Sequence, residues 1–192
     1  MIFNRRQSIS KIYHYENLRQ SGFSLFELTV VIIIISFLVV IGYRYYFETI
    51  EDSQAKVIQF QANTFSRSVA NIRGKALANN STKVNLDSAD KSNIAINVNE
   101  FGWPANTDAR SSPKSGTQTA NECAQLWQAI FKNAPPAKVE NDVNQSDSDF
   151  DYVISAIDGN ICRYRLSRSQ DGLYFFDYYL KTGTVLVSVP NN

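Results

Sequence analysis

The apolar run over residues 23–42 constrains this chain more than any other feature, because Glu27 is its only charged residue. As a helix, these 20 residues rise about 30 Å, which matches the hydrocarbon thickness of a bilayer. Gly22, a small residue, stands directly before the run, so a protease could cut there and leave the apolar segment on the mature chain. An acid inside a membrane span marks a functional contact. The run therefore predicts a retained anchor that carries an interaction site.

Charge is distributed unevenly around this run. Residues 1–22 hold four of the 19 basic side chains and one of the 18 acidic ones, which leaves 15 basic and 17 acidic side chains for the rest. Positive charge ahead of a span predicts a cytoplasmic N-terminus and an exported C-terminal part. Residues 42–47 offer no small-residue cleavage site and look like an interfacial aromatic belt. A plain single-span membrane protein is the alternative, but it leaves Glu27 unexplained.

The stretch GFSLFELTVVI, residues 22–32, resembles the class III signal of type IV pilins and pseudopilins. The resemblance implies that a prepilin peptidase cuts after Gly22 and that Phe23, the new first residue, is N-methylated. It assigns Glu27 as the acid that contacts a neighbouring subunit during assembly. Two features depart from the family. The first proline is Pro104, so the helix lacks the proline kink of many relatives, and the leader of 22 residues is long.

The helical pattern continues beyond the apolar run. Apolar residues recur at steps of three and four, with one polar member. The stripe consists of Phe47, Ile50, Gln54, Ile58, Ala62, Phe65, Val69, Ile72 and Ala76. We therefore expect one helix over residues 24–77, about 80 Å long at about 1.5 Å per residue. Its second half should lie across a sheet, because an amphipathic stripe has to be buried.

Shorter elements follow this helix. The patterns predict strands at 82–86 and 94–98, a turn at 101–104, a surface loop at 105–119, a helix at 121–131, and strands at 152–157, 161–166, 173–180 and 184–189. Hairpin signals at 158–160 and 181–183 make the last four strands an antiparallel meander. In the third of them Tyr174, Phe176, Tyr178 and Leu180 alternate against Asp177, so an aromatic face should meet the long helix.

These elements predict an α+β fold, and the resemblance makes it the type IV pilin-like fold, a long N-terminal helix packed on an antiparallel sheet. We expect four parts. They are a cleaved leader at 1–22, a transmembrane and assembly half of the helix at 23–43, an amphipathic half at 44–78 and a periplasmic globular domain at 79–192.

Both cysteines, Cys123 and Cys162, fall in the part expected to be exported, on a helix and on a strand. Because the periplasm is oxidising, we expect a disulfide between them. A bridge that closes about 40 residues stabilises a fold by roughly 4 kcal/mol in the chain-entropy model. A free thiol or a metal ligand is the alternative, although no second Cys or His stands near either residue in the sequence.

Catalytic chemistry has little support in the mature chain. The single histidine, His14, lies in the leader, which excludes Ser–His and Cys–His arrangements and histidine zinc sites from the mature chain. We expect a protein that is not an enzyme and holds no cofactor. Asp147, Asp149 and Asp151 have calcium-like spacing, but Tyr152 stands where an EF-hand loop needs glycine. A solvated acidic loop is the preferred interpretation.

The leading functional expectation is a structural subunit of a type IV pilus. Its partners would be other pilin subunits, the prepilin peptidase and the inner-membrane assembly machinery, and it would pass from the inner membrane into an extracellular filament involved in adhesion. Residues 101–104 and 123–128 resemble minor pilins of MSHA-type (mannose-sensitive haemagglutinin) pili. The alternatives are a pseudopilin of a type II secretion system and a tip-located module that binds DNA or a surface ligand. Arg163, Arg165 and Arg168 are the densest basic group of the mature chain, but the net charge of −2 over residues 23–192 disfavours nucleic acid.

Overall fold

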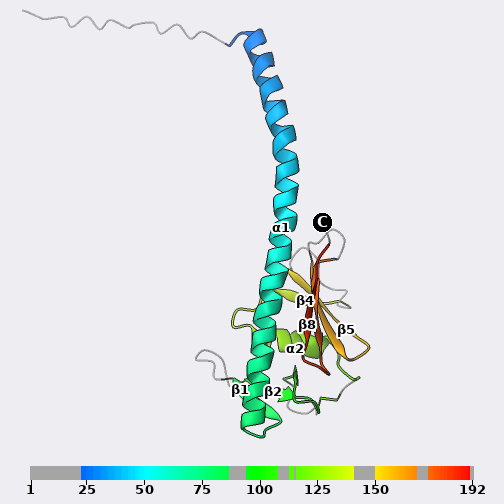
Figure 1. The fold of residues 1–192 in the computed structure, drawn as a ribbon. Helices are drawn as coiled ribbons and strands as arrows, with labels where there is room; N and C mark the ends of the chain where they lie inside the picture. Colours follow the sequence, from blue (N-terminus) through cyan, green and yellow to red (C-terminus); the bar gives the residue numbers. More distant parts are fainter. Residues whose placement is uncertain are drawn as a thin grey trace, which may run out of the picture. The chain divides into compact units, whose positions relative to one another are not determined.

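The computed structural model describes residues 23–86, 94–107, 113–114, 116–140, 150–167 and 173–190. The chain divides into two compact units, Met1–Tyr46 and Phe47–Asn192, and each is described by itself. A single helix, α1 (Leu25–Ala78), contributes its first part to one unit and its second part to the other (Figure 1). The boundaries of α1 differ by one residue at each end from those expected from the sequence.

The second part of α1 is amphipathic, as its spacing predicts. The side chains of Ile58, Ala62, Phe65, Val69, Ile72 and Ala76 are buried. They form one stripe, and the polar side chains between them remain exposed or half-buried. The helix ends in a turn in which Asn80 adopts a positive φ of 46°. Asparagine tolerates this left-handed conformation better than most residues, which explains why the helix stops there.

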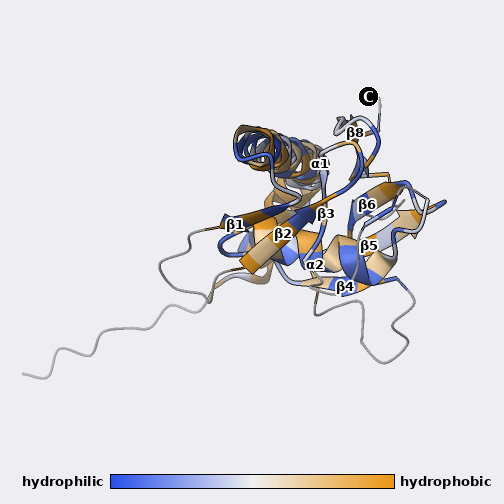
Figure 2. Cartoon of the chain, turned by 90° about the horizontal axis from the view of Figure 1, so that it is seen from below, coloured by the Kyte–Doolittle hydropathy of each residue, from blue (hydrophilic) through white to orange (hydrophobic). Residues whose placement is uncertain are grey.

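Two sheets and a second helix complete the larger unit. The three-stranded sheet is antiparallel in the order β1 (Lys83–Leu86), β2 (Ile94–Val98), β3 (Pro104–Asn106). The five-stranded sheet has the order β4 (Ala137–Val139), β5 (Tyr152–Ile157), β6 (Ile161–Leu166), β7 (Phe175–Tyr179), β8 (Val185–Ser188). Helix α2 (Ala120–Ile130) lies between the two sheets (Figure 2). The α+β expectation is confirmed.

The core of this unit is aromatic. Phe65 of α1 contacts the rings of Tyr164, Phe176 and Tyr178, with centroids 5.1–5.5 Å apart. Trp127 of α2 stacks on Tyr164 at 5.1 Å. Both helices therefore cover the same face of the five-stranded sheet. The expectation that the aromatic face of β7 meets the long helix is confirmed.

The expected surface loop at 105–119 is wrong in part. Ala105 and Asn106 belong to β3 and are buried, and Gln118 is buried with its Nε2 donating to the carbonyl of Ala105 at 2.6 Å. Asn106 also accepts from Asn97 and donates to Glu122, each at 2.8 Å. Polar composition suggested solvent exposure, but these side chains satisfy one another inside the fold.

Two further expectations need correction. The five-stranded sheet is mixed, because β4 pairs with β5 in parallel and carried no strand signal in its three residues. Helix α2 ends at Ile130, one residue before the expected end, because Phe131 adopts extended backbone angles. At its start Thr119 and Glu122 form a capping box, in which each side chain bonds the other's backbone N–H.

Trp103 connects the parts of the larger unit. On one face the Arg73 guanidinium of α1 lies 3.9 Å from the ring centroid. Gly183, in the β7–β8 turn, packs against the ring so closely that a Cβ there would overlap it. The backbone N–H of Trp103 donates to the Asn99 side chain at 3.0 Å, and Asn99 Nδ2 donates to the carbonyl of Leu180 at 2.7 Å. The turn before β3 is thus fastened to α1 and to the end of β7.

Candidate functional site

The candidate site is the start of α1, where the apolar run and its acid begin. Phe23 and Ser24 precede the helix, and the backbone N–H of Leu28 donates to the carbonyl of Ser24 at 3.0 Å. Glu27 lies in this first turn. The partial positive charge of a helix N-terminus stabilises a carboxylate there by about 0.3–1 kcal/mol. Glu27 therefore lies at the end of the helix where the backbone N–H groups carry partial positive charge.

The side chains of this helical segment face outward. The 19 residues Leu25–Tyr43 have a mean hydropathy of 2.8, and none is buried. By length and composition the segment can cross a membrane. Phe23, directly before it, is 80% exposed. An apolar surface of this extent has to be covered by lipid or by other apolar helices.

Two hydroxyl groups in this segment are already satisfied. Thr29 Oγ1 donates to the carbonyl of Phe26 at 2.7 Å, and Ser36 Oγ donates to the carbonyl of Ile32 at 2.8 Å. Both can therefore enter an apolar environment at little cost. Glu27 differs, because none of the residues that the structure describes forms a hydrogen bond or ion pair with its carboxylate. The segment presents one unpaired acid.

The structure describes only some of the residues expected at the processing site. Gly22 lies outside the described residues, whereas Phe23 and Glu27 are described at the start of α1. Cleavage after Gly22 and methylation of Phe23 stay predictions.

Cys123 of α2 and Cys162 of β6 form a disulfide, with their Cα atoms 5.6 Å apart. Both residues are fully buried. The Tyr164 hydroxyl donates to the carbonyl of Cys123 at 3.1 Å and adds a second link between the same elements. The two alternatives for these cysteines, a free thiol and a metal ligand, are therefore wrong.

The acidic cluster is only partly within the described chain. Asp147 and Asp149 lie outside the described residues, and Asp151 directly precedes β5. Within the described ranges, no group of three or more His, Cys, Asp or Glu side chains could hold a metal ion. The preferred solvated acidic loop and the alternative of a calcium site both stay predictions for this segment.

The basic group does not form an open stripe. Arg163 makes a bidentate pair with Asp177, with both bonds at 2.8 Å, and lies 4.0 Å from the Phe175 ring centroid. The hydrogen bonds to Asp177 raise the pKa of Arg163 above its ordinary value. Arg165 pairs with Glu140 at 3.9 Å, and Arg168 lies outside the described residues. Because the two described arginines are paired with carboxylates, this face gives a nucleic-acid backbone little free positive charge.

Comparisons with known proteins agree with the reading of the N-terminus. No curated protein and no solved structure matches the chain significantly. Residues 17–43 match the family described as the prokaryotic N-terminal methylation motif. The match contains Gly22, Phe23 and Glu27, the unpaired acid at the start of α1. The motif, the exposed apolar helix and the α+β fold together support a type IV pilin or pseudopilin.

Proposed function

We propose that this chain is a structural subunit of a type IV pilus, and within it a minor subunit. In this proposal residues 1–22 are a leader that prepilin peptidase removes after Gly22, and Phe23 is then methylated. Residues 23–43 hold the subunit in the inner membrane as a single pass, with a cytoplasmic N-terminus and the domain at 79–192 in the periplasm. The assembly machinery then transfers the subunit into an extracellular filament with a role in adhesion. The observation that carries the proposal is the methylation motif on an exposed apolar helix with one unpaired acid.

The composition of the apolar helix allows it to lie either in the membrane or among the helices of other subunits. Of the residues 25–41, all but Glu27, Thr29 and Ser36 are Leu, Ile, Val or Phe, which makes fourteen large apolar side chains, each at least 39% exposed. At about 0.3–0.6 kcal/mol each, they favour membrane insertion by roughly 4–8 kcal/mol, against about 3 kcal/mol for one acid at the centre of a span. The segment therefore inserts with Glu27 present. Extraction becomes possible only where other subunits' helices cover the same surface.

In the filament, Glu27 would fix how far along the axis one subunit's helix lies relative to the next. An ionised carboxylate in a dry helix bundle is costly unless a cation pairs with it. The amine that cleavage creates on Phe23 of a neighbouring subunit is such a cation, four residues away in sequence from its own Glu27. A pair formed between subunits would fix the axial register of one helix against the next.

The arrangement of the disulfide favours a minor subunit. Major subunits of the family usually place two cysteines around a loop near the C-terminus. Here the bridge ties α2 to β6, and β7 and β8 follow the second cysteine. The bridge therefore secures the core and does not bracket a terminal loop. Quantifying the copies of this chain per filament tests the minor role.

The test compares two substitutions in the apolar helix. Glu27→Val should leave membrane insertion intact and reduce incorporation into sheared filaments at least tenfold. Thr29→Val is the matched control, because the Thr29 hydroxyl bonds only its own helix backbone, and it should assemble normally. Normal incorporation of Glu27→Val would refute the role of the acid. Wild-type protein that stays out of pili while its loss abolishes protein secretion would indicate a type II secretion pseudopilin.

Intact mass of the membrane-extracted protein tests the processing steps. Removal of residues 1–22 and one added methyl group should both appear in the wild-type mass. Gly22→Val should give only a species that retains the leader. A mature-length mass from Gly22→Val would show that cleavage occurs elsewhere.

A further inference from the structure

Strand β8 forms one edge of the five-stranded sheet, at the opposite end from β4 (Figure 2). Edge strands usually carry a charge, a proline or a bulge, which prevents pairing with another chain. Of the four edge strands in the described part of the chain, β1 contains Lys83, β3 begins with Pro104 and β4 contains Lys138. Strand β8 contains neither a charge nor a proline, its register with β7 has no bulge, and residues 182–192 include no charged residue. Its edge therefore lacks the protection that the other three have.

The pairing of β8 with β7 determines which backbone groups point outward. The backbone N–H of Tyr179 donates to the carbonyl of Thr184 at 2.9 Å, so these two residues form a hydrogen-bonded pair. Bonded and non-bonded pairs alternate along an antiparallel ladder, and this register continues through β8. Leu186 therefore bonds β7, whereas the N–H and carbonyl groups of Val185 and Val187 point away from it. No strand in the described ranges pairs with this outer side of β8.

Both faces of this edge are apolar. Val187 lies opposite Phe176, whose ring contacts Phe65 of α1, so the Val187 side chain is on the helix face of the sheet. Leu186, the preceding residue, is on the other face. Val187 is 39% exposed and Leu186 is 52% exposed. A strand added here would meet an apolar side chain on each face, which favours an uncharged apolar run over a strand that alternates between apolar and polar residues.

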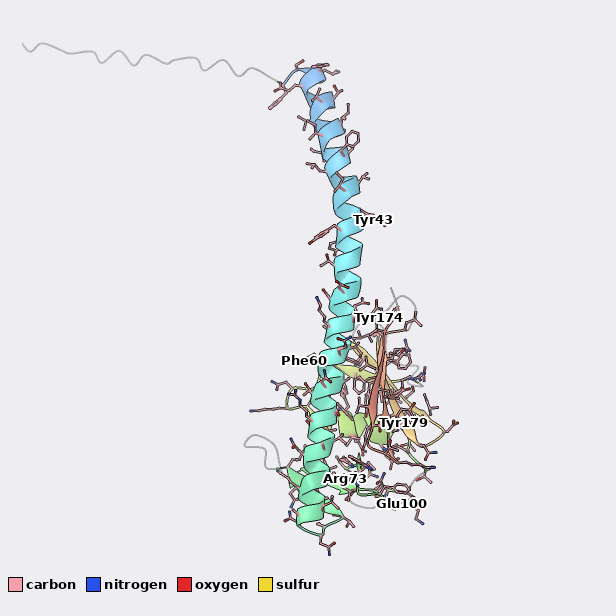
Figure 3. All side chains as sticks on the ribbon, viewed as in Figure 1. Tyr43, Phe60, Arg73, Glu100, Tyr174 and Tyr179 are labelled. Atoms are coloured by element: carbon pink, nitrogen blue, oxygen red, sulfur yellow. A yellow bond between two sulfur atoms is a disulfide. The ribbon has the colours of Figure 1, made fainter. Side chains whose placement is uncertain are left out.

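The direction of α1 argues against a second copy as the added strand. In Figure 3 the order from Phe60 to Arg73 along α1 has the same direction as the order from Tyr174 to Tyr179 along β7, so β8 runs against α1. Two β8 strands paired antiparallel would direct their α1 helices oppositely, whereas copies anchored in one membrane share the direction of α1. A minor subunit also has mainly other subunits as neighbours. These points favour a different chain.

We propose that the outer edge of β8 pairs with an extended, uncharged segment of a different subunit of the same filament. The backbone N–H and carbonyl groups of Val185 and Val187 exchange hydrogen bonds with this segment, and Leu186 and Val187 contact its side chains on the two faces. The sheet thus continues into the neighbouring subunit without any contribution from charge. The inference rests on the proposed filament function, and it names the surface by which this minor subunit selects its neighbour.

Photo-crosslinking in the full chain tests the identity of the neighbour. The substitution Thr184→p-benzoylphenylalanine places a photoreactive group at an exposed residue directly before β8. Cells are irradiated, and membranes and sheared filaments are analysed by denaturing gel and mass spectrometry. The expected species joins one copy of this chain to an uncharged segment of a different chain that carries the same N-terminal methylation motif. The matched control places the group at Leu77, which is 64% exposed on α1, and should not attach to that segment.

A proline tests whether the contact depends on the backbone. In the photoreactive chain Val187→Pro removes an outward N–H and no bond to β7, so it should lower the crosslink yield at least about fivefold. Val187→Ala keeps the N–H and should leave the yield within about twofold. Urea unfolding verifies that both variants fold. Val187→Lys adds a charge without changing the backbone and should also lower the yield at least about fivefold, which keeps the test decisive if the proline variant does not fold.

Each other outcome overturns a defined part of the proposal. A crosslink between two copies of this chain, or to a chain without the methylation motif, overturns the proposed neighbour. Equal yields from Val187→Pro and Val187→Ala overturn the backbone pairing. Filaments that contain the photoreactive chain without a crosslink overturn the β8 contact alone. A wild-type chain that never enters filaments overturns the proposed function and the β8 contact together.

Discussion

Substitution of Gly183 by alanine should destabilise the larger unit by about 2–5 kcal/mol. Gly183 has a φ of 70°, a conformation that costs an alanine about 1–2 kcal/mol. The new Cβ would also overlap the Trp103 ring, which the Arg73 guanidinium contacts as well. Overpacking of this kind costs about 1–3 kcal/mol. Since domains are stable by only about 5–15 kcal/mol in total, the loss is a large fraction.

Substitutions at two other glycines distinguish the backbone strain from the overlap with the Trp103 ring. Gly116 also has a positive φ, 84°, but a Cβ there meets nothing within 4 Å, so Gly116→Ala should cost only the strain of about 1–2 kcal/mol. Gly74 lies within α1 with open space around it, so Gly74→Ala should stabilise by up to about 1 kcal/mol. Urea unfolding of the detergent-solubilised, oxidised chain, followed by the fluorescence of its two tryptophans, measures all three. If Gly183→Ala costs no more than Gly116→Ala, the ring is not held rigidly and the reasoning is wrong.

Two further predictions concern buried tyrosines. Tyr178→Phe should cost about 1–3 kcal/mol in urea unfolding, because the Tyr178 hydroxyl donates to the carbonyl of Pro104 at 2.8 Å and its loss leaves that carbonyl unsatisfied. Tyr152→Phe should be neutral or stabilising, since its hydroxyl has no partner; an equal loss from both would contradict the hydrogen-bond assignment. Burial raises the pKa of Tyr152, Tyr164 and Tyr178 above the ordinary value of 10. The folded state then keeps protons that the unfolded state releases, so the contribution of these tyrosines to stability is constant below about pH 10 and falls above it, by up to about 4 kcal/mol per pH unit for three such groups. Urea titrations at pH 9 and pH 11 check this, and equal stabilities at the two values would refute it.

The features that could be predicted from the sequence are those with long-range periodicity. The stripe from Ile58 to Ala76 repeats over five turns, and the alternation of Tyr174, Phe176 and Tyr178 is strict, so both identified their buried faces. The strand β3 has three residues, too few to show a period, and it begins with a proline. Strand β4 could not be predicted for the same reason, because it also has three residues. Its parallel pairing with β5 depends on the chain segment that returns from α2.

The burial of several polar side chains could not be predicted from the sequence for a different reason. Asn97, Asn106 and Gln118 are polar residues in polar stretches, and each is satisfied by a partner at least nine residues away. No local pattern distinguishes them from a solvated loop. At the candidate site the situation is reversed, because Glu27 could be identified from its apolar neighbours alone.

The disulfide between α2 and β6 also determines how the chain responds to a pulling force. Cys123 and Cys162 are 39 residues apart in sequence, and a fully extended chain of that length spans about 130–140 Å. Under tension the oxidised protein does not release this length of chain even after its sheets have separated. Helix α1 has no disulfide to the sheets and packs on them through its buried side chains, so it can separate first. A subunit carried in a filament under load would therefore yield at α1 while the covalent loop keeps α2 beside β6, ready to refold when the load is removed.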